Sequence, residues 1–366
     1  MLCYGTRMII NATNIGQRLT GISRYPLSLS LYFLKHWDYP FQLFINKCAL
    51  TYFEKVENKY KIKLVDGNMS PDFGFRGHLL RLLWTNKLCL KNPKELIFNT
   101  SQLEGCFLQK KQIITVHDLI PLLFPRYHKK QYFYFRYMLL LMLRNSAKIV
   151  TGSNHTKHLI MKFYKIPEEK ILVIPYGIND FLLNQTPKHK KQSYILYVGR
   201  LSPTKNIAGL VKAFELLLDE YDLEIKLKLT GNEQKLSFRI SERIRDKVEF
   251  VGYPDDDQLV DLYRNAQLLV FPSFYEGFGL PPLEAMACGC PAIVSNVASL
   301  PEVCGDAAYY VDPYNIESIA EGIYRVLTDE PLRRSLIAKG LARAKLFSWE
   351  KSAQGHIKLF EEVLGS

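Results

Sequence analysis

The most constraining feature of this sequence is a series of short apolar runs, each followed by a segment with helical periodicity. Residues 112–120 and 148–153 in the first half read QIITVHDLI and KIVTGS, and residues 194–200 and 267–273 in the second half read YILYVGR and QLLVFPS. Continuous β-branched strands that alternate with helices are typical of parallel sheets covered on both faces. The sequence therefore predicts an α/β protein with doubly wound parallel sheets.

The chain is long enough for two such domains. It has 366 residues, of which 48% are hydrophobic, so each half can bury a core of its own. Residues 179–193, NDFLLNQTPKHKKQS, are polar, basic and broken by proline, which predicts a linker. We expect domains at 1–180 and 181–366, with a final helix at about 349–366 that can pack back on the first domain.

The cysteines and the apolar segments favour a cytoplasmic protein. The seven cysteines are odd in number, scattered, and without C-x-x-C spacing, so we expect reduced thiols. They are Cys3, Cys48, Cys89, Cys106, Cys288, Cys290 and Cys304. The N-terminus does not resemble a secretory signal, and the longest aliphatic run, residues 138–143, is far shorter than the ~20 residues of a membrane span.

The charge is placed asymmetrically along the chain. Residues 1–180 hold 26 Lys and Arg against 11 Asp and Glu, whereas residues 181–366 hold 22 against 25. This pattern predicts an anionic partner for the first domain. Nucleic acid is one such partner, but the sequence contains no dedicated nucleic-acid motif.

One basic segment in the first domain points to a membrane surface. Residues 124–148 interleave basic side chains with aromatic ones and an aliphatic run. The basic residues are Arg126, Lys129, Lys130, Arg136 and Arg144, and the aromatic ones are Tyr132, Phe133, Tyr134, Phe135 and Tyr137. The segment fits either a helix packed on the sheet with a basic outer face or an interface with an anionic membrane. We expect peripheral binding at the inner face of the membrane.

A glycine- and proline-rich turn in the second domain, FPSFYEGFGLPPLEAMACGCP, carries two glutamates. Glu276 lies in the loop, and Glu284 lies in the first turn of a helix expected to start at Pro281. The amides of Phe278, Gly279 and Leu280 would point out of this helix N-terminus, where phosphate binds well. Taken singly, each glutamate could also be an ordinary loop or first-turn acid.

The spacing of Glu276 and Glu284 resembles the glutamate pair of the retaining glycosyltransferases of family 4. These GT-B enzymes bind a nucleotide-sugar between two Rossmann-like domains that face each other across a cleft. The resemblance implies that Glu276 approaches the donor sugar and that Glu284 binds the ribose hydroxyls. An acceptor-only carboxylate suits a diol, so the assignment is chemically sound.

A second match lies in YVGRLSPTKN, which places Arg200 and Lys205 on one loop after a strand. Taken alone, they could be two ordinary loop cations. The same family has Arg and Lys at this spacing, which implies that they neutralise the donor diphosphate. The segment FVGYPDDDQLVDLYRNA is similar to the family's segment beside the nucleotide base, which implies a place near the base for Tyr253.

The first domain gives weaker matches. TGISRY, residues 20–25, is similar to a TGIGRY loop of mannosyltransferase-like members, with Ser23 in place of the second glycine, and implies a donor contact at Gly21. TVHDLIPLLFP resembles a segment whose histidine lies beside the donor sugar, which makes His117 the candidate. A hydrogen-bonded core histidine is the alternative interpretation. Residues 37–110 match no motif.

The resemblance implies transfer of a hexose with retention, preferably mannose from GDP-mannose, to a hydroxyl of a glycan or lipid-linked glycan acceptor. A UDP-sugar donor, a GT-B epimerase or phosphorylase, and a non-catalytic glycan-binding protein are the alternatives. Glu276, His117, Arg200 and Lys205 are the candidate catalytic residues. The acids at 255–257 open a helix rather than form a metal site, and the resemblance implies a reaction that needs neither metal nor cofactor.

Overall fold

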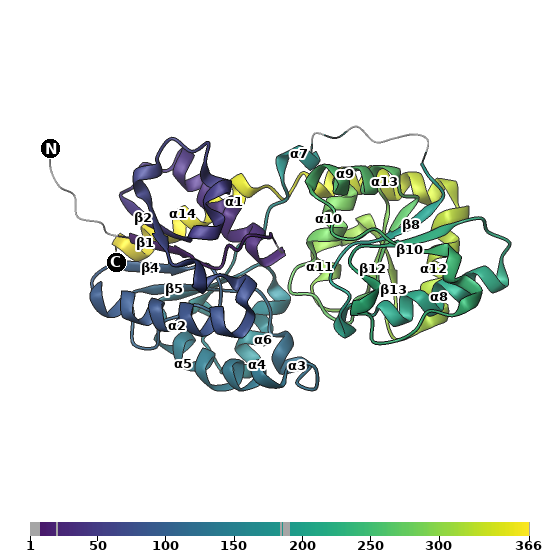
Figure 1. Ribbon diagram of the computed structural model, residues 1–366. Helices are drawn as coiled ribbons and strands as arrows, with labels where there is room; N and C mark the ends of the chain where they lie inside the picture. The colour runs from purple at the N-terminus through teal and green to yellow at the C-terminus, as the bar shows by residue number, and fades with distance from the viewer. Residues whose placement is uncertain (1–7, 20, 184, 186–190, 366) are drawn as a thin grey trace. The chain divides into compact units, whose positions relative to one another are not determined.

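The computed structural model describes residues 8–19, 21–183, 185 and 191–365, and the chain divides into two compact units (Figure 1). Unit 1 comprises Met1–Gly177 and Trp349–Ser366, and unit 2 comprises Ile178–Ser348. Each unit contains one parallel sheet with helices on both faces. The prediction of two doubly wound α/β domains is confirmed.

The sheet of unit 1 has seven described strands in the order β3-β2-β1-β4-β5-β6-β7, all parallel. They are β1 Met8–Ala12, β2 Phe41–Asn46, β3 Ile62–Val65, β4 Leu96–Asn99, β5 Gln112–Val116, β6 Lys148–Thr151 and β7 Ile171–Val173. The chain reverses its direction of travel across the sheet between β1 and β4. Ligands of doubly wound sheets bind beyond the carboxyl ends of the strands at such a switch point.

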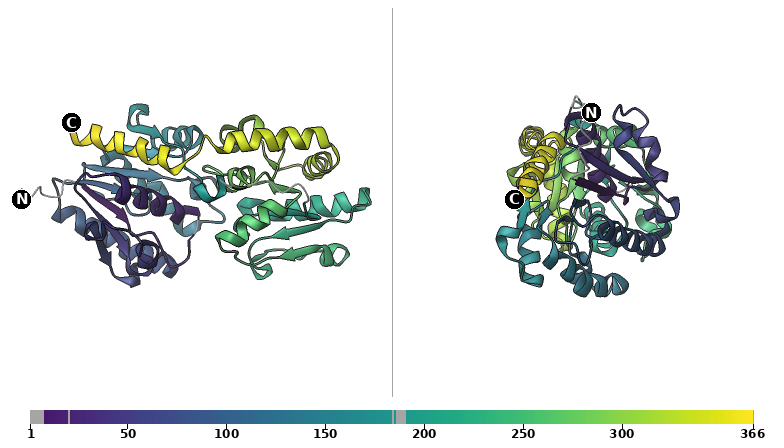
Figure 2. Two further views of the ribbon diagram at one scale, coloured as in Figure 1. Left: turned by 90° about the horizontal axis from the view of Figure 1, so that it is seen from above. Right: turned by 90° about the vertical axis from the view of Figure 1, so that its left-hand side faces the viewer.

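The helices of unit 1 form two layers. They are α1 Gly21–His36, α2 Gly74–Lys91, α3 Ile120–Leu123, α4 Lys129–Phe133, α5 Leu139–Asn145, α6 Asn154–Tyr164 and α14 Trp349–Gly365. In β5, Ile114 and Val116 pack in one core cluster with residues of α2, α5 and α6, while Thr115 between them contacts Tyr25 of α1. This alternation follows the two-residue period of a strand. Helix α14 lies beside α1, so the C-terminal helix belongs to unit 1 (Figure 2).

The sheet of unit 2 repeats the same arrangement with six described strands, in the order β10-β9-β8-β11-β12-β13. They are β8 Tyr194–Tyr197, β9 Lys226–Leu229, β10 Val248–Phe250, β11 Leu268–Phe271, β12 Ala292–Ser295 and β13 Ala308–Val311. The helices are α7 Asp180–Leu183, α8 Ile207–Glu220, α9 Asp256–Asn265, α10 Leu280–Ala287, α11 Leu300–Cys304, α12 Ile316–Thr328 and α13 Glu330–Ala344. The switch point of this sheet lies between β8 and β11.

Several local expectations are revised. Residues 124–148 contain α4 and α5 joined by a π-helical turn, Tyr134–Met138, rather than one regular helix. Helix α10 begins at Leu280, one residue before the expected start, because a proline also fits the second position of a helix. The expected linker holds the short helix α7, and its residues 184 and 186–190, like Thr20 of the TGISRY loop, lie outside the described residues.

The cysteine prediction is wrong for one pair. Cys89 and Cys106 form a disulfide, with their Cα atoms 6.6 Å apart, within the range that a disulfide spans. The two cysteines are 17 residues apart in sequence and become neighbours only through the fold. Among the described cysteines, Cys48, Cys288, Cys290 and Cys304 are free. None of the helices in the described ranges combines the length and apolarity that a membrane crossing requires.

Candidate active site

The candidate site of unit 2 forms where two loops meet beyond the carboxyl ends of β8 and β11. The loop after β8 carries Arg200 and Lys205, and the loop after β11 carries Glu276. The backbone N–H of Phe274 donates to the carbonyl of Thr204 at 3.0 Å and joins the two loops. Lys205 and Glu276 thus come together at the switch point of the sheet, although 71 positions separate them in sequence.

Lys205 and Glu276 form the central ion pair of this site. Lys205 Nζ lies 2.6 Å from Glu276 Oε1, and the two side chains are 16% and 10% exposed. The hydroxyl of Ser299 lies 3.0 Å from the carbonyl of Glu276 and 2.8 Å from that of Phe278, and its one proton can be donated to either of them. The Glu276 carboxylate is therefore held in place through both its side chain and its backbone.

Glu284 lies on α10 and is also buried, with 7% of its surface exposed. The hydroxyl of Tyr263 on α9 donates to Glu284 Oε2 at 3.0 Å. Burial, together with the neighbouring carboxylate, raises the pKa of Tyr263 well above its usual value. Tyr263 therefore remains protonated at neutral pH and continues to donate, which orients Glu284.

The turn between the glutamates requires glycine at one position. Gly279 precedes α10 with a φ of 109°, in the left-handed region. A Cβ at Gly279 would lie 2.7 Å from Leu300 Cδ2, so there is also no room for a side chain. Phe278, Gly279 and Leu280 thus occupy the N-terminus of α10, where the sequence predicts a phosphate site.

Two further predicted residues lie at the same sheet edge, Arg200 on the loop after β8 that also carries Lys205, and Tyr253 on the loop after β10. Arg200 is exposed and follows Gly199, whose N–H donates to the Thr230 hydroxyl at 2.9 Å. Tyr253 is 70% exposed and follows Gly252, which pairs with Gly231 in an isolated bridge. Both side chains are accessible to a ligand at this edge.

In unit 1, His117 lies at the carboxyl end of β5 and is buried. Its Nε2 lies 2.9 Å from the carbonyl of Thr100, which can only accept, so Nε2 carries the proton. Its Nδ1 then accepts from the hydroxyl of Tyr176 at 2.7 Å. Burial lowers the pKa of His117 to about 4, so the ring is neutral at pH 7. A sugar contact through either nitrogen would have to replace one of these partners.

The loop after β1 leads into α1 at Gly21, where an added Cβ would meet no atom. Ser23, the departure from the family pattern, is buried in the first turn of α1, and its hydroxyl donates to the carbonyl of Asn14. The hydroxyl of Thr100 donates to Asn14 Oδ1 at 3.0 Å and links this loop to the one after β4. The loop is therefore well anchored despite the serine.

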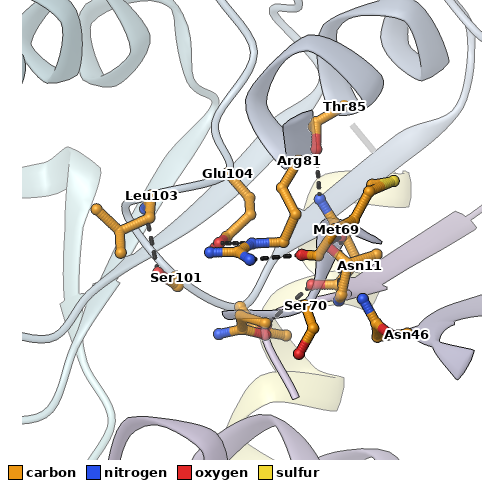
Figure 3. A network of polar contacts seen from close by, with 12 residues as sticks. Asn11, Asn46, Met69, Ser70, Arg81, Thr85, Ser101, Leu103 and Glu104 are labelled. Atoms are coloured by element: carbon orange, nitrogen blue, oxygen red, sulfur yellow. Dashed lines mark hydrogen bonds and ion pairs between the residues drawn. The ribbon is translucent and has the colours of Figure 1, made fainter. Parts of the chain in front are cut away.

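A buried ion pair between Arg81 and Glu104 lies next to Met69 (Figure 3). Arg81 Nε on α2 lies 2.9 Å from Glu104 Oε1, with side-chain exposures of 3% and 1%, and Arg81 Nη1 donates to the carbonyl of Met69 at 2.6 Å. Three residues further on, Asp72 Oδ2 accepts from the backbone N–H of Gln17 at 2.8 Å. The Arg81–Glu104 pair thus fixes the turn that holds the loop after β1.

Sequence reasoning missed several of these supporting residues. Tyr263 and Ser299 each lie more than 20 positions from the glutamate that they position, and neither belongs to the motif that carries the two glutamates. Arg81, Glu104 and Asp72 lie in the stretch 37–110, where no motif was found. Within the described ranges, no group of three or more His, Cys, Asp or Glu side chains is placed to hold a metal ion.

The chain was compared with known protein families. Residues 56–180 match the family model described as Glycosyltransferase Family 4, and residues 179–343 match the model described as Glycosyl transferases group 1. O-antigen chain mannosyltransferase B of Escherichia coli is 33% identical over 378 residues, covering 96% of this chain and 99% of that protein. O-antigen chain mannosyltransferase RfbU of Salmonella typhimurium is 31% identical over 339 residues, covering 87% and 93%.

Solved structures show the same fold at lower identity. Sucrose-phosphate synthase from Thermosynechococcus elongatus gives a TM-score of 0.78 at 20% identity and covers 99% of this chain and 100% of its own. WaaG, a glycosyltransferase involved in lipopolysaccharide biosynthesis, gives 0.73 at 15% identity and covers 98% and 100%. The related proteins are named transferases, so the epimerase, phosphorylase and non-catalytic alternatives gain no support from them. The chain belongs to glycosyltransferase family 4 and is a glycosyltransferase of the GT-B fold, related to O-antigen chain mannosyltransferases.

Proposed function

We propose that this enzyme transfers mannose from GDP-mannose, with retention of the anomeric configuration, to a hydroxyl of a glycan or lipid-linked glycan acceptor. The observation that carries the proposal is the gathering of Lys205, Glu276 and Glu284 at the switch point of unit 2. The choice of mannose is supported by the names of relatives that are 33% and 31% identical.

Each of the four charged side chains of unit 2 contacts one part of the donor. Glu284 accepts hydrogen bonds from the ribose hydroxyls, and Glu276 contacts the mannose. Arg200 and Lys205 face the diphosphate and stabilise the charge that develops as it leaves. Lys205 contacts Glu276 at 2.6 Å. The two side chains are therefore close enough to act on either side of the bond between the sugar and the diphosphate.

The remaining candidates complete the donor site. The N-terminus of α10, at Phe278, Gly279 and Leu280, faces the phosphates, because helix N-termini bind anions. Tyr253 stacks near the nucleotide base. In unit 1, Gly21 and His117 provide contacts to the donor, and the neutral His117 ring does so without adding charge.

The reaction takes place on one face of the sugar. The bond between the anomeric carbon and the diphosphate oxygen breaks, the bond to the acceptor oxygen forms on the same side, and the acceptor proton passes to the departing phosphate. Arg200 and Lys205 provide fixed positive charge during this step, so the proposal requires neither a metal nor a cofactor.

We place this enzyme at the cytoplasmic face of an anionic membrane. A lipid-linked acceptor is presented there, and the excess of 26 basic over 11 acidic residues in positions 1–180 favours an anionic surface. The acceptor and the membrane would then both be met by unit 1.

A donor screen tests the proposal. The purified enzyme would be heated with GDP-mannose, other GDP-sugars and UDP-hexoses to measure thermal shifts, and release of the nucleoside diphosphate would be measured with and without EDTA. We expect the largest shift and EDTA-resistant release with GDP-mannose. Preference for a UDP-sugar would overturn the assigned donor, and release that depends on added Mg²⁺ or Mn²⁺ would overturn the metal-independent step.

A further inference from the structure

Helix α2 presents apolar side chains to solvent along its outer face. Phe75, Leu79, Leu83 and Leu90 are 67%, 44%, 61% and 70% exposed. The first three are spaced four residues apart and therefore lie on one side of the helix. The outer face of a helix on a globular protein is normally polar, whereas this stripe is apolar.

A second stripe of the same kind runs along α4, the π-helical turn and α5. Phe133, Tyr137 and Leu141 again recur every four residues, with exposures of 65%, 59% and 52%, and Met138 beside them is 46% exposed. Their neighbours Tyr134 and Leu139 point inward and are buried. The exposed residues are therefore not needed for the core of unit 1.

The two stripes lie on neighbouring elements of unit 1. The rings of His78 on α2 and Tyr134 have their centroids 4.9 Å apart, and Leu82 of α2 belongs to the same core cluster as Met142 of α5. Figure 1 shows α2, α4 and α5 together at the lower side of unit 1. The outer faces of these helices can therefore form one surface, here named the α2–α5 surface.

The charge of the α2–α5 surface is of one sign. Neither residues 73–94 nor residues 119–167 contain a single Asp or Glu. Eleven Lys and Arg side chains in these segments are exposed, and nine of them lie on or next to α2, α4 and α5, namely Arg76, Lys87, Lys91, Lys94, Arg126, Lys129, Lys130, Arg136 and Arg144. Large apolar groups framed by cations and free of carboxylates are the composition that binds an anionic membrane interface.

We propose that the α2–α5 surface docks unit 1 on an anionic lipid bilayer, with the two apolar stripes in the headgroup region and the basic residues among the lipid phosphates. A second copy of the chain is a poorer partner, because a symmetric dimer through this surface would bring the two sets of nine cations together. The use of docking rests on the proposed lipid-linked acceptor, but docking itself is measurable without transfer.

Vesicle co-sedimentation of the full chain tests the proposal. We expect binding to vesicles of phosphatidylglycerol and phosphatidylcholine, little binding to phosphatidylcholine alone, and loss of binding as salt rises. The double variants Leu79→Ser/Leu83→Ser on α2 and Phe133→Ser/Tyr137→Ser on the second stripe should each weaken binding at least tenfold. The matched control is Tyr60→Ser, which removes an aromatic ring that is 72% exposed outside both segments and should bind as the wild type does.

Each outcome separates docking from catalysis. All changed residues are exposed, so circular dichroism should be unaltered, and the thermal shift with donor should persist in every variant. Equal binding to neutral and anionic vesicles, or binding to neither, would overturn the proposal. Unchanged binding of the Leu79/Leu83 variant would remove α2 from the surface. Self-association that is lost in both variants, without lipid binding, would replace the bilayer by a second copy. A docked enzyme that binds no nucleotide-sugar would instead refute the proposed function alone.

Discussion

Replacing Tyr263 by phenylalanine should weaken nucleotide binding without touching the ligand directly. The change removes only the hydroxyl that donates to Glu284 Oε2 at 3.0 Å. Both residues are buried, with exposed fractions of 0% for Tyr263 and 7% for Glu284, so water cannot readily replace the lost hydroxyl as a donor. The carboxylate is then less well oriented toward the ribose diol that we propose it binds.

The size of the effect follows from the energy of such a bond. A hydrogen bond to a charged group contributes ~1.5–3 kcal/mol, and each 1.4 kcal/mol corresponds to about tenfold in affinity. If the whole contribution were expressed in binding, the Kd for GDP would rise by roughly 10- to 150-fold. We expect about tenfold, because Glu284 stays on the same buried turn of α10 and part of the loss will appear as reduced stability.

Isothermal titration with GDP and with 2′-deoxy-GDP measures the effect and its origin. The wild type should prefer the ribonucleotide, and Tyr263→Phe should lose most of this preference. The matched control is Tyr310→Phe, which removes a hydroxyl that donates to the carbonyl of Gly305 on another part of unit 2. A Kd unchanged within twofold, with the preference for ribose intact, would refute the role of Tyr263 and with it the proposed contact of Glu284.

Three further outcomes are expected. Glu276→Gln should lower transfer by ~10²–10³ while GDP still binds in calorimetry, and equal loss of both would remove the sugar contact. Breaking the buried Arg81–Glu104 pair by Glu104→Gln should lower the free energy of unfolding by ~3–5 kcal/mol, read from urea denaturation, whereas a loss below 1 kcal/mol would indicate a solvated pair. Burial lowers the pKa of His117 and His356 to about 4. Below pH ~6.5 these two histidines therefore bind protons in the unfolded chain but stay neutral in the folded one. Stability should therefore be full above pH 6.5 and fall between pH 6.5 and 4, by up to ~1.4 kcal/mol per pH unit for each histidine; a His356→Gln variant with the wild-type slope would contradict this.

Several of the strands could be predicted from local sequence patterns, whereas their order in the sheets could not. Runs such as Leu268–Phe271 are continuously apolar because both faces of a parallel strand are covered, and the residues after them are free to carry function. Glu276, Arg200 and Lys205 could be found for that reason. Their loops follow strands that pair directly in the sheet, and the carboxyl ends of paired parallel strands lie at one edge.

The rest depends on contacts between distant segments, which no local pattern encodes. Tyr263 contributes to the site only because α9 packs against α10, and its place in the sequence is that of an ordinary core tyrosine on an amphipathic helix. The disulfide of Cys89 and Cys106 has the same origin. The stripe on α2 was missed for another reason. Its leucines fit a helical period equally well whether that face is inside or outside, and only the packing of α2 on the sheet decides.

In both units candidate residues lie at or beside the switch point of the parallel sheet. In each sheet the chain leaves the central pair of strands in opposite directions, so the two following loops separate and open a space at the strand edge. A hydrogen bond then ties the separated loops together, from Thr100 to Asn14 after β4 and β1, and from Phe274 to Thr204 after β11 and β8. The candidate residues differ in character at these equivalent places. Unit 2 presents buried carboxylates and cations suited to a charged donor, whereas unit 1 presents a neutral histidine and an anchored glycine loop, which suit uncharged sugar hydroxyls better than phosphates.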